Sequence, residues 1–247
     1  MKTILANGHK FRFYDDISEL PVSQFHRYSK YVLVDSGIGD SIESIDQHIT
    51  KIAEFMGRDM KKARQELLNL RQCLYLVATE QDLSHKSLMC LVASVDGKKW
   101  DDFSDSGIDE LYRMANGERE CVFIELRKDV CQRIDNDLKT YFPSIFDEAV
   151  EKNYLDLLRK RALLQLSHII EGKDTTEEFE ALTSDILRYS HPQSFMGEKN
   201  AEVEFDKKFE DMCLAMSEEY GGRVKGYSVM EFYSAYERMV KKNKKRK

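Results

Sequence analysis

The stretch KTILANGHKFRFY, residues 2–14, decides between an all-helical fold and a mixed one. Two runs of alternating apolar and polar residues flank Asn7 and Gly8, the pair that best supplies the two positive-φ positions of a type I′ turn. We therefore predict an N-terminal β-hairpin in which both residues have positive φ. A second short apolar run, LMCLVASVDGKKW at residues 88–100, predicts a buried strand and a tight turn at Asp96-Gly97.

Apolar residues elsewhere repeat with helical spacing, and only three prolines interrupt 247 residues. One helix is expected after Pro21, with its buried stripe at Phe25, Tyr28 and Val32. The next two are expected at 41–55, capped by Ser41, and at about 60–79. Their predicted buried faces are Ile42, Ile45, Ile49, Ile52 and Phe55 on the first, and Leu67, Leu70, Leu74 and Val77 on the second.

Residues from 118 onward read as purely helical. Segments are expected at 118–141, at 150–170 with Leu157, Leu158, Leu164 and Ile169 inside and Gly172 as the C-cap, from Thr175 to before His191, at 202–220, and at 229–240 with Ser228 as the N-cap. The predicted fold class is α+β, predominantly α-helical with a small N-terminal β-hairpin or sheet. The predicted parts are an α+β domain at 1–117, a helical domain at 118–240 and a basic tail at 241–247.

Composition favours an intracellular assembly part over an exported protein. The formal charge is −6, and the tail alone carries six positive charges, so the remainder carries −12. The five cysteines, at 73, 90, 121, 131 and 213, form no CxxC pair and are expected as buried thiols. No apolar run approaches the roughly 18 residues of a membrane helix, so no membrane partner is expected.

No sequence motif indicates catalysis or a cofactor. The six histidines contain no pair at i, i+3 or i, i+4 spacing, so no metal site is predicted. Neither a phosphate-binding G-x-x-x-x-G-K-[ST] nor a G-x-S-x-G nucleophile motif occurs. We therefore expect a protein that is not an enzyme and that needs no cofactor.

Two groups of residues are candidates for protein contacts. Asp101, Asp102 and Asp105 lie in WDDFSDSG without the register of a calcium loop; they indicate either helix capping by Ser104 or Asp105 or an acidic docking patch. The second group lies in the aromatic stretch YSVMEFYSAYERMV and comprises Tyr227, Phe232, Tyr233 and Tyr236. Core packing and a protein interface both explain these aromatics.

The chain ends in KKNKKRK, whose basic residues are Lys241, Lys242, Lys244, Lys245, Arg246 and Lys247. Three roles are open for this tail: a solvated solubility segment, contact with nucleic-acid phosphates, or contact with the acidic face of a neighbouring subunit. An acidic body argues against sequence-specific DNA recognition by the folded part.

Several stretches together resemble a family of structural-region proteins from tailed bacteriophages of Bacteroidota, the crAss-like phages included. They are DDISELPVSQFHRYSKYVLVD, LLNLRQCLYLV, LVASVDGKKWDDFSDSG, TYFPSIF and FEDMCLAMSEEYGGRVKGYSVMEFYSAYERM. The resemblance implies a virion protein of the neck or tail, a head–tail connector ring between portal and tail that assembles in the host cytoplasm. It implies a homo-oligomeric ring, with portal or tail proteins as partners. Non-specific DNA contact is expected from the basic charge of the tail, not from the resemblance. A tail-assembly chaperone, an ejected cargo protein, and a cytoplasmic enzyme or regulator without a recognisable motif remain alternatives.

Overall fold

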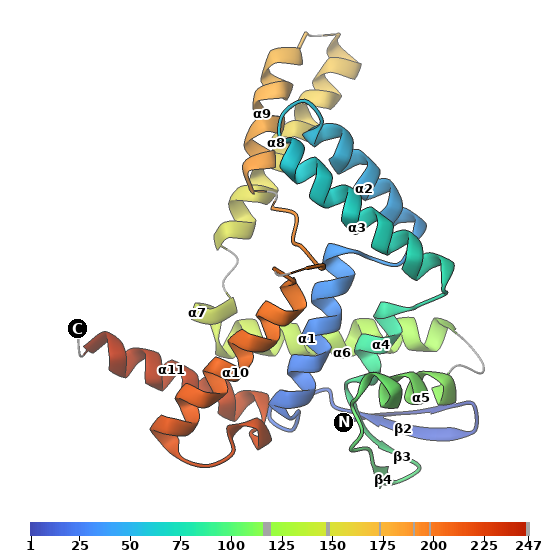
Figure 1. Cartoon of the computed structure of the whole chain (residues 1–247), viewed down its shortest axis with the longest axis vertical. Coiled ribbons are helices and arrows are strands. Elements are labelled where there is room, and N and C mark those ends of the chain that lie inside the picture. The colour runs from blue at the N-terminus through green and yellow to red at the C-terminus, as the bar shows by residue number, and fades with distance from the viewer. Residues whose placement is uncertain (116–119, 147–148, 173, 190, 198, 246–247) are drawn as a thin grey trace.

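The computed structural model describes residues 1–115, 120–146, 149–172, 174–189, 191–197 and 199–245. Strands open the chain and helices make up most of the rest (Figure 1), which confirms the predicted fold class. In chain order the elements are β1 (Lys2–Ala6), β2 (His9–Phe13), α1 (Val22–Gly37), α2 (Ile42–Phe55), α3 (Met60–Ala78), α4 (Leu83–Met89), β3 (Val92–Val95), β4 (Lys98–Lys99), α5 (Asp105–Ala115), α6 (Glu120–Tyr141), α7 (Pro143–Phe146), α8 (Ala149–Glu171), α9 (Thr176–Tyr189), α10 (Ala201–Tyr220), the 3₁₀ turn η1 (Val224–Gly226) and α11 (Val229–Lys245).

The sheet is an antiparallel meander in the order β1-β2-β3-β4. Asn7 and Gly8 join β1 to β2 with φ of 47° and 79°, which confirms the predicted turn. Asp96 and Gly97 repeat this geometry between β3 and β4, with φ of 50° and 79°. The Asp96 carboxylate accepts a hydrogen bond from the backbone N–H of Lys10 (2.7 Å), so the second turn is tied to β2.

The main core lies between the sheet and the helices α1, α4, α5 and α6. Phe11 and Phe13 of β2 are fully buried in it, as is Val92 of β3. The expected domain boundary near Gly117 falls outside the described residues, yet the core does not divide there. Helix α6 adds to the same cluster Phe123, Leu126, Val130, Ile134 and Leu138.

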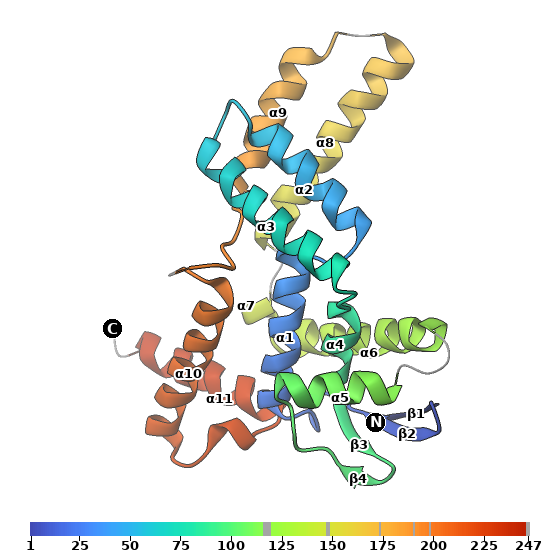
Figure 2. The same cartoon turned by 45° about the vertical axis from the view of Figure 1, so that its right-hand side comes forward.

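Two antiparallel helical pairs rise from this body, α2 with α3 and, above them, α8 with α9 (Figures 1 and 2). Arg161 Nη1 donates to Glu54 Oε1 (2.9 Å), and Lys62 Nζ donates to the carbonyl oxygen of Leu187 (2.8 Å). Phe55 packs with Leu187 in a small apolar cluster at the same place. These contacts fix the middle of α8 and the C-terminal end of α9 on the loop end of the first pair.

The C-terminal helices pack beside α1, and the last one extends further than predicted. Ser228 and Glu231 form a capping box: Ser228 Oγ accepts from the N–H of Glu231 (3.3 Å) and Glu231 Oε2 accepts from the N–H of Ser228 (2.9 Å). This confirms Ser228 as the cap. The predicted end at Val240 is wrong, because α11 continues through the first lysines of the tail to Lys245. Lysines are good helix formers, so no signal in the sequence stops the helix earlier.

Candidate protein-interaction surfaces

A buried polar network holds α2 against α3. His48 and Glu66 are 3% and 2% exposed, and His48 Nδ1 lies 3.0 Å from Glu66 Oε1. The other ring nitrogen of His48 lies 2.7 Å from the carbonyl oxygen of Ile38, and Asn69 Nδ2 donates to the carbonyl oxygen of Gln193 (3.1 Å). Because polar groups buried without partners are costly, this network fixes the register of the two helices.

The carboxylate of Glu66 stays ionised in this seam. Burial alone would raise its pKa, but the hydrogen bond from His48 and the charge of Lys51 outweigh that cost and hold the pKa of Glu66 below its ordinary value. Lys51 Nζ lies 3.4 Å from Glu66 Oε1. The seam thus contains an ionised carboxylate beside apolar residues, among them Cys73 and the predicted core residue Ile45.

The predicted buried face of α2 is only partly buried. Phe55 is buried as predicted, but Ile42 and Ile49 are 69% and 52% exposed, and His48 occupies the interior instead. Met56, at the C-cap of α2, is also exposed. Ile42, Ile49 and Met56 follow one another at seven-residue intervals, which places them on one stripe of the helix.

The same correction applies to α3. Leu67 and Leu74, predicted as core, are 56% and 48% exposed, while Glu66 and Cys73 point inward. Met60 is exposed as well, again seven residues before Leu67. The reason is that the stripe containing Cys73 and Glu66 meets α2, and the leucines lie on a neighbouring stripe.

The two exposed stripes open on one side of the helical pair. Each stripe is rotated by about a third of a turn, in the same sense, from the side that contacts the other helix. Since α2 and α3 run antiparallel, equal rotations bring the stripes to the same face. We name this surface the α2–α3 face, and it consists of Ile42, Ile49, Met56, Met60, Leu67 and Leu74.

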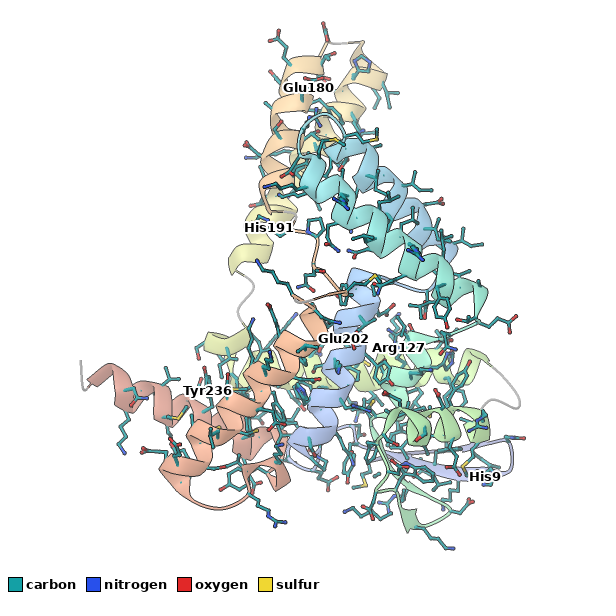
Figure 3. The ribbon with its side chains drawn as sticks, in the orientation of Figure 1. His9, Arg127, Glu180, His191, Glu202 and Tyr236 are labelled. Carbon is teal, nitrogen blue, oxygen red and sulfur yellow. The ribbon has the colours of Figure 1, made fainter. Side chains whose placement is uncertain are left out.

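A second apolar surface lies at the far end of the α8–α9 pair. Ile169 is 76% exposed, although the sequence predicts it on the buried side of its helix. Leu166, Ile169 and Phe179 line a shallow hollow there of about 660 Å³. Figure 3 shows Glu180 near the same end of α9. We name this surface the α8–α9 tip; its exposed apolar members are Leu163, Leu166, Ile169 and Ile170, and its exposed carboxylates are Glu177, Glu178 and Glu180.

The aromatic residues of α11 contribute mainly to the protein's own core. Phe232 is fully buried and packs against Phe209 of α10, with ring centroids 5.9 Å apart. Tyr233 contacts four other aromatic rings, Phe146 at 5.1 Å among them, and its burial raises the pKa of Tyr233 to about 12. Phe232 is therefore not available to a partner in this fold.

The other two aromatic candidates lie nearer the surface. Tyr227 and Tyr236 are half-buried, and Figure 3 shows Tyr236 on α11 away from the main core. Contact of these two side chains with another protein stays a prediction.

The three acidic candidates around the start of α5 all have partners within the chain. Asp102 accepts a hydrogen bond from the N–H of Ser104 (2.9 Å), and hydrogen bonding from the side chain and backbone of Ser104 lowers the pKa of Asp102. Asp105 pairs with Arg27 Nη2 at 2.9 Å, and Asp101 lies 3.2 Å from Lys99 Nζ. Local capping and ion pairing thus account for much of this cluster, although all three remain exposed.

Only the first part of the basic tail is described in side-chain detail. Lys241 Nζ donates to Glu237 one turn earlier (3.1 Å), and Lys242 pairs with Glu219 of α10. The backbone of Lys244 and Lys245 continues α11, while Arg246 and Lys247 lie outside the described residues. The tail therefore begins as a helical extension, with two of its charges already paired.

A polar cleft of about 1160 Å³ runs past α4 and α6, where Figure 3 labels Arg127. Two of its carboxylates cap α4: Asp40 accepts from the N–H of Leu83, and Asp82 accepts from the N–H of His85 (2.8 Å). Burial raises the pKa of Asp40. No described lining residue has a buried polar side-chain atom without a partner.

Other chemistry is sparse over the same part of the chain. Cys73, Cys90 and Cys213 are buried free thiols whose pKa values burial raises, as expected for small core residues. In the described ranges no three His, Cys, Asp or Glu side chains gather as metal ligands would. No described helix is both long and apolar enough to cross a membrane.

Neither exposed apolar surface was predicted from the sequence, but a signal for one of them exists. Seven-residue spacing at 42, 49 and 56 and again at 60, 67 and 74 is the pattern of a packing seam between helices. Comparison with known proteins adds no assignment: no family model, no curated protein and no solved structure matches this chain.

Proposed function

We propose that this chain is a structural component of a tailed-phage virion, a ring protein of the neck or tail that connects portal and tail. One observation carries the proposal: the aligned, exposed apolar stripes of the α2–α3 face. Exposed apolar residues on monomeric proteins are usually scattered singly, whereas contiguous patches mark surfaces that another protein covers. A subunit of an assembly needs such surfaces.

The position of these surfaces supports a connecting role. Both are on helical pairs that project from the body (Figures 1 and 2). The resemblance to phage structural-region proteins supplies the particle, and with it the partners: further copies of the chain and portal or tail proteins. The basic residues at the end of α11 are suited to non-specific contact with DNA phosphates.

Protein composition of purified particles tests the proposal. Mass spectrometry of mature virions from the virus that encodes this chain is expected to find it in a fixed ratio to the portal protein. A tail-assembly chaperone would be present in infected cells and absent from mature virions. An ejected cargo protein would be present in full particles and lost from particles that have released their DNA. Absence from every particle fraction would overturn the proposal.

A further inference from the structure

The exposed stripe of α3 combines apolar side chains with arginines. Arg64 and Arg71 lie on the same stripe as Leu67, since all are separated by three, four or seven residues. Both arginines are exposed, and neither pairs with a carboxylate in the described residues. Segment 58–75 contains five Lys or Arg residues against two Asp or Glu, and one of those two, Glu66, is buried. The outward side of α3 is thus apolar and positive.

The α8–α9 tip has the opposite charge on a similar apolar base. Segment 162–180 contains five Asp or Glu residues and one Lys. Glu177, Glu178 and Glu180 are exposed and make no ion pair with a described residue. Leu163 and Ile170 stand seven residues apart, about 10.5 Å along the helix, the same interval that separates Leu67 from Leu74. The tip is therefore apolar and negative, with matching spacing.

Within one chain these two surfaces leave each other uncovered. Leu67 and Ile169 are 56% and 76% exposed in the same structure. Arg161 fixes the middle of α8 and Lys62 fixes the C-terminal end of α9, while the far end of the pair extends away beyond the α2–α3 loop (Figures 1 and 2). The complementary surface is therefore available only from another molecule.

We propose that the α3 side of the α2–α3 face binds the α8–α9 tip of a second copy of this chain. The apolar stripes supply most of the burial, and the arginine and glutamate side chains set the orientation and speed the encounter. Because the two patches differ, the contact is heterologous and repeats from subunit to subunit, closing into a ring where the rotation allows. The inference rests on the proposed function for its biological role, since a connector ring requires such a head-to-tail contact.

Two single substitutions test the contact in the full-length protein. Leu67→Asp places a charge in the α3 stripe, and Leu166→Asp places one in the tip; both positions are exposed, so the fold should persist. Leu214→Asp, at an exposed leucine of α10 outside both surfaces, is the matched control. Circular dichroism melting is recorded for each protein, and light scattering after size exclusion gives its mass.

The wild type and Leu214→Asp are expected to self-associate beyond a monomer. Each interface variant should be monomeric at the same concentration, with association weakened about tenfold or more because a charge would be buried. A mixture of Leu67→Asp and Leu166→Asp should form a dimer and nothing larger, since only one junction has two intact surfaces.

Charge reversal gives a second readout. Arg64→Glu with Arg71→Glu should abolish association, and adding Glu177→Lys with Glu178→Lys to the same chain should restore it. The proposed contact is wrong if the wild type is monomeric, if the Leu67→Asp and Leu166→Asp variants assemble normally, or if their mixture stays monomeric. The proposed function is separable from this result. If the Leu67→Asp variant is incorporated into particles, the proposed contact is wrong and the virion role stands. If the wild type self-associates through this contact but is absent from particles, the contact stands and the virion role is wrong.

Discussion

Gly8 is a residue at which the backbone itself demands glycine. Its φ is 79°, and a Cβ added there would meet no atom within 4 Å. Any cost of substitution therefore comes from backbone strain and not from a clash with neighbours. The type I′ turn that begins the sheet is specified by two residues, which is why the sequence could predict it.

Gly8→Val is expected to lower the free energy of unfolding by about 1 kcal/mol or more, because a β-branched residue resists the left-handed region. Urea unfolding followed by circular dichroism measures the change. Asn7→Gly, which keeps both positive-φ positions accessible, should change stability little. An unfolding midpoint unaffected by Gly8→Val would contradict the type I′ assignment.

His26 is a residue whose protonation should destabilise the fold. Its ring stacks on Phe205 and Phe209, with centroids 4.6 and 3.9 Å away, and its Nε2 lies 2.9 Å from Asp206 Oδ1. Burial lowers the pKa of His26 below its ordinary value of 6.5, despite the opposing effect of Asp206. Between the unfolded and folded pKa values the unfolded state binds more protons, so stability falls as the pH drops below about 6.5.

Melting temperatures measured from pH 8 to pH 5 test this expectation. The wild type should lose stability as the pH falls below about 6.5. The His26→Phe variant should lose less over the same interval, because the phenyl ring cannot be protonated. His191→Gln, at an exposed histidine, is the control and should follow the wild type. A pH dependence that His26→Phe leaves unchanged would show that other groups cause it.

At the scale of elements, helix ends were predicted well because their signals are local. Ser41 accepts from the N–H of Ser44 (3.2 Å), Ser228 caps α11, and Gly172 ends α8 with φ of 64°. Helix faces were predicted poorly. The isoleucines of α2 and leucines of α3 have the periodicity of a buried face, but periodicity does not say whether the covering surface belongs to the same chain.

The sequence also gave no sign of the polar seam between α2 and α3. His48 and Glu66 are 18 positions apart, and each alone resembles a surface residue. Only the antiparallel packing of the two helices brings them together. Likewise, the pairing of β2 with β3 joins segments about 80 residues apart, which no local pattern encodes.

Glu66→Leu is expected to destabilise the protein by about 3 kcal/mol, because it leaves His48 without its carboxylate partner inside the seam. His48→Leu combined with Glu66→Leu should cost less than Glu66→Leu alone, since no imidazole is then buried without its carboxylate partner. Denaturant unfolding of the three proteins forms the comparison, and Gln47→Leu at a neighbouring exposed position is the control. A double variant that is less stable than Glu66→Leu would contradict this expectation, because His48 would then stabilise the fold even without its carboxylate partner.

At the scale of the molecule, the sequence predicts an acidic body with a basic tail, and the structure shows where on the body the charged residues lie. The acidic character expected of the whole body is concentrated in part at the α8–α9 tip, whereas α3 is locally basic. A net charge averages over such patches, so it could not indicate two complementary surfaces. Their assignment needed the exposures of individual side chains.

The tail is the remaining charged feature, and we expect it to work at an assembly contact. Because α11 is helical through Lys245, the backbone of the tail up to that residue continues the helix that carries Tyr233. Lys241 and Lys242 already pair with Glu237 and Glu219. Exposed charge pairs contribute only about 0–1 kcal/mol each and are screened by salt, so the tail should affect rate more than affinity.

Deleting residues 243–247, which keeps both ion pairs, is expected to slow assembly at low salt and to matter little at high salt; deleting 241–247 should slow it further. Assembly is followed by light scattering after dilution into low salt, and DNA binding by the same proteins is measured by fluorescence anisotropy over a range of salt concentrations. Loss of DNA binding with unchanged assembly would place the tail against phosphates, where affinity falls linearly with the logarithm of salt concentration. No change in either measurement would leave the tail as a solvated end of α11, because a charge that contacts a partner must alter at least one of the two.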